Sequence, residues 1–186
     1  MKFAKTLIAL AVVGASASSF AASNIATGAA TAAISATAAL DFRVAVPRII
    51  YLQVGTGTAF AANATVDLVT FSLTAGQVTG GGAVVGTSGA AITARVLGNG
   101  GAVNFSAAGS GTGLTNVGLA TIPWSQITGT GSAGLPHPTI GGAATVLPAT
   151  LGIVNQSTTF TFSYANATQM AAGDYNGTVT YTAALP

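Results

Sequence analysis

The sequence predicts an all-β protein, and three observations carry this prediction. Apolar and polar residues alternate along several stretches of the chain, as they do in half-buried strands. Glycine, asparagine or proline bounds these stretches, and no stretch after residue 21 repeats apolar residues with a helical period. The stretches are short and regularly spaced. Together these features favour a single β-sandwich of about eight or nine antiparallel strands.

The first 21 residues have the three parts of a secretory signal peptide. Lys2 and Lys5 form a basic end, Thr6–Gly14 is apolar, and small residues precede a cleavage site after Ala21. The apolar run is too short to cross the ~30 Å hydrocarbon core of a membrane. We therefore expect export through the periplasm to the cell surface or the extracellular space, with no membrane span in the mature chain.

The remaining chain is nearly devoid of charge. Only 4% of the 186 residues are charged, whereas 50% are hydrophobic, and there is no cysteine. The low charge and high hydrophobicity exclude a disordered chain and a basic nucleic-acid binder. Because there is no cysteine, burial and hydrogen bonding must hold the fold without disulfides. A neutral surface gives little repulsion between copies, which favours self-association. After residue 21, three arginines balance three aspartates, namely Arg43, Arg48 and Arg95 against Asp41, Asp67 and Asp174.

The individual elements follow from this alternation. Residues 22–33 are a low-complexity leader that we expect to be flexible. From Ile34 to Val46 every second residue is apolar, which predicts a long half-buried strand with Asp41 and Arg43 on its wet face. The glycine-rich Gly98–Gly101 predicts a hairpin turn. The expected domains are a signal peptide (1–21), the leader (22–33) and a sandwich (34–186). Further strands are expected over 49–54, 65–73, 90–97, 102–107, 119–127, 143–147, 157–164 and 175–185.

Catalytic chemistry is nearly absent from the sequence. Gly129, Gly131 and Gly134 match the spacing of a dinucleotide-binding loop, but prolines follow where such a loop needs a helix. His137 is the single histidine and no acidic residue lies near it in sequence, which favours a surface-loop position over a metal ligand. No nucleophile elbow accompanies it. We predict a protein that is not an enzyme and that uses no cofactor and no metal.

Two residues remain candidates for contact with a ligand. Trp124 is the single tryptophan and could stack on a sugar, although a tryptophan beside an apolar run also suits a core. His137 lies in the loops that follow. Together, Trp124 and His137 support an alternative function as a monomeric secreted surface module or carbohydrate-binding module.

The end of the chain resembles a known family. Residues 172–182 contain a Gly-x-Tyr turn followed by alternating Thr, Val and Tyr, and this stretch resembles the closing strand of bacterial fimbrial (pilin-like) subunits and of some Ig-like surface domains, although the fimbrial cysteine pair is missing. The mature chain is also similar to a group of uncharacterised secreted β-rich proteobacterial proteins, through residues 122–127, 164–166 and the Val-Thr-Tyr-Thr-Ala ending. The resemblance implies export and an Ig-like or pilin-like sandwich.

The leading functional hypothesis is a structural subunit of a pilus-like extracellular or cell-surface fibre. Copies would form a homopolymer by β-strand donation, in which an N-terminal segment adds to the open sheet edge of a neighbour. A periplasmic chaperone or assembly protein is a candidate partner. An ordinary first strand is the alternative for residues 34–46, and an outer-membrane β-barrel is disfavoured because the chain lacks aromatic girdles and a terminal aromatic residue. The strand-donor candidates are Ile34, Leu40, Phe42 and Val44, and the acceptor-edge candidates are Val179 and Tyr181.

Overall fold

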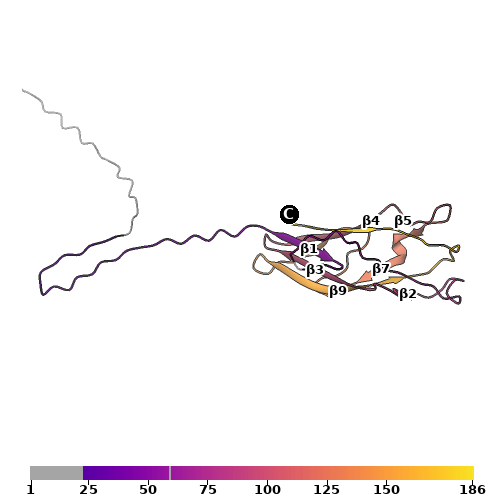
Figure 1. Ribbon diagram of the computed structural model, residues 1–186, viewed down its shortest axis with the longest axis horizontal. Coiled ribbons are helices and arrows are strands. Elements are labelled where there is room, and N and C mark those ends of the chain that lie inside the picture. Colours follow the sequence, from indigo (N-terminus) through magenta and orange to yellow (C-terminus); the bar gives the residue numbers. More distant parts are fainter. Residues whose placement is uncertain (1–22, 59) are drawn as a thin grey trace, which may run out of the picture. The chain divides into compact units, whose positions relative to one another are not determined.

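The computed structural model describes residues 23–58 and 60–186 (Figure 1). The expected signal peptide, residues 1–21, lies outside this part of the chain. The chain divides into two compact units, the first ending at Val46 and the second running from Pro47 to Pro186. Within the described ranges, no helix is long and apolar enough to cross a membrane.

The described part of the first unit, residues 23–46, contains no strand and no helix (Figure 1). Its one backbone hydrogen bond in the structure is a turn in which the Ala32 amide donates to the Ala29 carbonyl over 2.9 Å. The sequence predicts a half-buried strand over residues 34–46, and this prediction is wrong for the single chain, because every residue there is exposed and unpaired. Alternation supplies a strand with two faces, but a strand forms only where another strand accepts its backbone hydrogen bonds.

Five antiparallel strands of the second unit form its larger sheet. β3 and β9 are its longest members, and β3 pairs with both β1 and β9. β9 continues to β2 and also pairs with β7. The strands are β1 (Ile50–Val54), β2 (Val84–Val85), β3 (Ala91–Gly98), β7 (Ile127–Thr130) and β9 (Val154–Tyr164).

Three further strands form a second sheet in the order β10-β4-β8, and two short strands pair with each other. The sheet consists of β4 (Val103–Gly109), β8 (Thr145–Leu147) and β10 (Val179–Ala184). The short pair is β5 (Gly113–Leu114) with β6 (Ile122–Pro123), and a single-turn 3₁₀ helix, η1 (Trp124–Gln126), follows it. The prediction of an all-β, antiparallel protein is confirmed.

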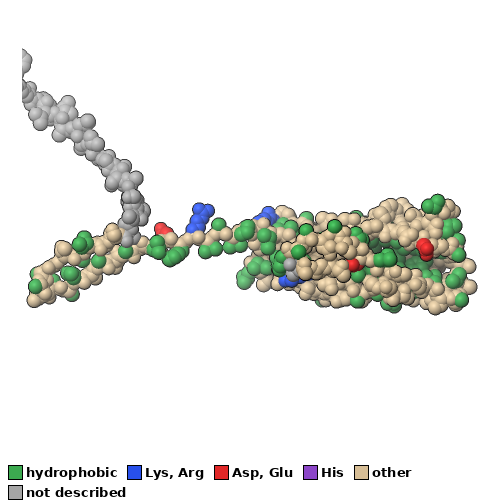
Figure 2. All heavy atoms as spheres, in the orientation of Figure 1, with side chains coloured by type: hydrophobic (Ala, Val, Ile, Leu, Met, Phe, Trp, Pro, Cys, Tyr) green, Lys and Arg blue, Asp and Glu red, His purple; other side chains and the backbone are tan. Residues whose placement is uncertain are grey.

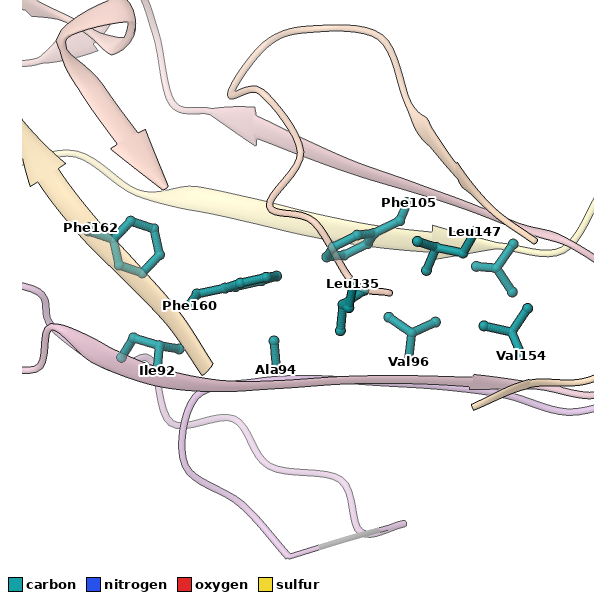
Figure 3. Packing of buried hydrophobic residues seen from close by; sticks show 10 residues of the cluster. Ile92, Ala94, Val96, Phe105, Leu135, Leu147, Val154, Phe160 and Phe162 are labelled. Atoms are coloured by element: carbon teal, nitrogen blue, oxygen red, sulfur yellow. The ribbon is translucent and has the colours of Figure 1, made fainter. Parts of the chain in front are cut away.

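The principal core draws side chains from both sheets (Figure 3). Phe105 of β4 and Phe160 of β9 are fully buried, and their rings stack with centroids 6.3 Å apart. Alternate residues of β3 point into the same core, because successive side chains of a strand face opposite sides of its sheet. Its buried members are Ile92, Ala94, Val96, Val103, Phe105, Leu135, Leu147, Val154, Phe160 and Phe162. A smaller buried cluster contains Val84, Ile122 and Tyr164.

The glycine-rich turn after β3 does not form the predicted hairpin. The strands on either side of the turn, β3 and β4, belong to different sheets. β4 cannot pair with β3, because β1 and β9 already occupy both edges of β3. The Asn99 side chain ties the turn to the start of β1, since its Oδ1 accepts from the Ile49 amide and its Nδ2 donates to the Pro47 carbonyl, each over 2.7 Å. The turn therefore carries the chain from one sheet to the other.

The strand predicted over residues 65–73 is also wrong. Only Thr70 makes a bridge there, to Ser88. Asp67 instead accepts hydrogen bonds from the amide and the hydroxyl of Thr56. These bonds tie the segment to the loop after β1 through a side chain and leave its backbone unpaired except at Thr70.

Candidate functional site

The strand-donor candidates are exposed apolar side chains on a segment that pairs with no strand among the described residues. Ile34, Leu40, Phe42 and Val44 are 58%, 76%, 87% and 85% exposed. They lie at even positions, so an extended backbone would place them on one face. Large apolar side chains gathered in this way usually mark a surface that another molecule covers.

The acceptor-edge candidates lie on β10, at an edge of the three-stranded sheet. β10 pairs with β4 along one side, and no strand within the described residues pairs with its other side. Val179 and Tyr181 are half-buried, while Thr180 between them is exposed. Tyr181 stacks on Phe105 with ring centroids 6.0 Å apart, so the inner face of this edge strand is part of the principal core.

His137 occupies a half-buried site between the two sheets, which corrects the expectation of a surface loop. Its ring meets Phe160 and Phe162 of β9 edge-on, at centroid distances of 4.9 and 5.2 Å. Its Nε2 shares a hydrogen bond of 2.7 Å with the hydroxyl of Tyr181 on β10. Burial lowers the pKa of His137 to about 4, and it raises the pKa of Tyr181 well above its ordinary value. The imidazole is therefore neutral at pH 7.

Trp124 is half-buried at the start of η1 and belongs to neither buried cluster. Its indole lies against Gly109 at the end of β4 and against Gly177 just before β10, where any β carbon would collide with the ring. Its Nε1 donates to the Ser110 carbonyl over 3.1 Å. The two glycines thus leave space for the Trp124 indole, whose Nε1 already donates a hydrogen bond within the protein.

Trp124 and His137 line one pocket of about 350 Å³. Both residues are ligand-contact candidates of the sequence, and the structure brings them to the same pocket. Gly129 of β7 lies directly beneath the His137 ring, where a β carbon would collide with it. None of the lining residues is charged at neutral pH. They are Trp124, Ser125, Ile127, Thr128, Gly129, His137, Thr139 and Ile140.

The aromatic surroundings of His137 are not predictable from the sequence. Phe160 and Phe162 are recognisable as one face of a strand, but Tyr181 comes from the other sheet, and only packing of the sheets joins them. The three glycines that resemble a nucleotide loop also have packing roles. Gly129 contacts His137, Gly131 contacts Phe160, and Gly134 contacts Gln156. Within the described residues, no helix follows them.

Charged side chains are sparse on the visible surface (Figure 2). The fold and these sites define an all-β protein with antiparallel sheets, an uncharged pocket and an unpaired apolar segment. No protein-family model matches the chain, and no match was found among curated proteins or solved structures.

Proposed function

We propose that the chain is a structural subunit of an extracellular or cell-surface fibre, and that copies join by β-strand donation. In this proposal the signal peptide directs export, and the two larger sheets act as one Ig-like or pilin-like sandwich. The observation that carries the proposal is the segment 34–46, whose alternating apolar side chains are exposed and have no strand partner among the residues that the structure describes.

The acceptor is the open edge of β10 in a second copy. Along β10, Val179, Tyr181 and Ala183 share the half-buried face, and the exposed Thr180 and Thr182 alternate with them. The donor repeats this period, with apolar residues every second position. A strand added beside β10 would therefore continue both faces of the sheet. Its apolar face would extend the core, and its other face, with Asp41 and Arg43, would stay in water.

The low charge of the chain supports repeated contact between identical copies. The chain after residue 21 has as many aspartates as arginines, three of each, so its net charge is zero. Little electrostatic repulsion therefore opposes contact between subunits. Burial of Phe42 or Leu40 from water contributes roughly 1.5–3 kcal/mol per side chain. Backbone hydrogen bonds to the β10 edge would add affinity, and the alternating side chains of the donor would set its register.

The experiment compares two neighbouring substitutions in the signal-cleaved protein. Phe42→Ser removes the most exposed of the candidate donor side chains, and Arg43→Ser, its matched control, changes the opposite face. We expect filaments in negative-stain electron microscopy from the unchanged protein and from Arg43→Ser, and none from Phe42→Ser. We also expect a ladder on gels of unheated samples that collapses after boiling.

Filaments of equal length and number from Phe42→Ser would overturn donation by this segment. Compact monomers from all three proteins would argue against spontaneous homopolymers. Addition of a periplasmic chaperone or assembly protein would then be the next test of fibre formation.

A further inference from the structure

The pocket beside Trp124 has the size of a site for a small molecule. Its volume is about 350 Å³, at the lower end of the roughly 300–1,000 Å³ typical of ligand pockets. It lies within the unit that starts at Pro47, and its lining includes no residue of the donor segment. The pocket therefore shares no residue with the donor segment, and it meets the acceptor strand β10 through the hydrogen bond between His137 and Tyr181.

The lining favours an uncharged ligand. None of the lining residues is ionised at neutral pH, because burial keeps the imidazole of His137 neutral. A charged group that entered the pocket would lose hydration and find no opposite charge. Anions, cations and metal ions are thus poor occupants.

The pocket combines an aromatic plane with the hydroxyl groups of two side chains. The Trp124 Nε1 is engaged by the Ser110 carbonyl, so the indole offers the pocket an apolar surface and no hydrogen bond. Ser125 and Thr139 are exposed, and their hydroxyls have no hydrogen-bond partner among the described residues. Each hydroxyl can both donate and accept. The Thr128 side chain lies on the opposite face of β7 from Gly129 and the His137 ring.

This combination matches the two surfaces of a sugar ring, which has apolar C–H faces and a rim of hydroxyl groups. We infer that the pocket between Trp124 and His137 binds one ring of a neutral carbohydrate, with the ring face on the indole and its hydroxyls toward Ser125 and Thr139. An apolar ligand would displace water from these two hydroxyls without replacing its hydrogen bonds, and it would fit the pocket less well.

Trp124 reports on this pocket without any label, because it is the single tryptophan of the chain. The signal-cleaved full chain is titrated with glucose, galactose, mannose and N-acetylglucosamine while tryptophan emission is recorded, and sorbitol serves as the non-cyclic control. We expect a saturable change with at least one sugar, with a dissociation constant of about 1 mM, and none with sorbitol.

Two variants test the assigned contacts. Thr139→Val keeps the shape of the side chain and removes its hydroxyl, and we expect affinity to fall about tenfold, as for the loss of one hydrogen bond. Ser125→Ala provides a second, independent hydroxyl deletion with the same expected direction. Thr159→Val, on an exposed position of β9, is the matched control and should bind as the unchanged protein does.

The inference is overturned if no sugar gives a saturable change beyond that of sorbitol. It is also overturned if Thr139→Val and Ser125→Ala both bind as tightly as Thr159→Val. Circular dichroism of each variant confirms that the compared proteins are folded. Loss of filaments in Phe42→Ser with sugar binding retained would separate this site from the fibre contact.

Discussion

At the level of single residues, His137 is placed where an imidazolium has no charged partner. It is surrounded by the rings of Phe160, Phe162 and Tyr181, and burial lowers its pKa from 6.5 to about 4. In the unfolded chain the ring regains its ordinary pKa. Between these two values the unfolded state binds more protons than the folded state, so stability decreases as the pH falls through this window.

We therefore expect the neutral His137 ring to stabilise the folded protein fully above about pH 6.5. This part of the free energy of unfolding is lost progressively as the pH falls toward about 4. Its size is on the order of 1–2 kcal/mol, because the ring is only half-buried and solvent screens part of the effect. Urea unfolding of the unchanged protein and of His137→Gln at several pH values measures it. Tyr181, the titratable group that faces the ring, stays protonated throughout this window because its pKa is raised.

The variant lacks the titrating ring, so its stability should vary less with pH between these limits. Equal pH dependence of the two proteins would show that the imidazole is solvated in the folded state. That result would contradict its placement between the sheets.

Gly129 is a second position where one atom decides local packing. A β carbon there would collide with the imidazole of His137, which cannot move far because aromatic rings surround it. We expect Gly129→Ala to lower the free energy of unfolding by about 1–3 kcal/mol through overpacking. Gly76→Ala is the control, since a β carbon at Gly76 meets no atom within 4 Å. Chemical denaturation of both variants tests the contrast, and equal stabilities would contradict the close packing of Gly129 against His137.

At the level of elements, the sequence predicts those strands whose alternation is long and whose partners are close in the fold. The expected strands at 90–97 and 157–164 correspond to β3 and β9, which pair with each other along eight positions. Residues 34–46 alternate equally well but form no strand. Periodicity defines the two faces of a segment and contains no information about which strand accepts its hydrogen bonds.

The turn at Gly98–Gly101 illustrates the same limit for connections. Its composition suits a hairpin, yet β3 and β4 lie in different sheets. The bonds from Asn99 to Ile49 and Pro47 that fix this turn span about fifty residues of sequence. Short two-residue strands such as β2 and β5 are also invisible to a pattern that needs several alternations.

The candidate pocket is predictable only in part. Trp124 and His137 stand out because each is the single residue of its type. Their shared pocket depends on Gly109, Gly129 and Gly177, which leave space for the two rings, and glycines in a chain with 25 of them carry no distinguishing signal. The tertiary fold, which brings these positions together, decides where the site lies.

At the level of the whole molecule, the division at Val46 and Pro47 separates an exposed segment from a unit with its own core. None of the described residues 23–46 is buried. If residues 34–46 were the first strand of this core, their removal would lower the free energy of unfolding by roughly 1.5–3 kcal/mol for each apolar side chain that they bury. The structure gives them no such role within one chain.

We therefore expect the chain without residues 22–46 to remain folded, with a free energy of unfolding within about 0.5 kcal/mol of the full mature chain, because the deletion removes no buried contact. We also expect it to form no filaments, since the donor segment is missing. The control deletion, residues 22–33 alone, retains residues 34–46 and should behave like the full chain in both respects. Urea unfolding and electron microscopy of the three proteins make the measurement. Loss of several kcal/mol in the longer deletion alone would mean that residues 34–46 pair within their own subunit in solution, and strand donation between copies would then lose its donor.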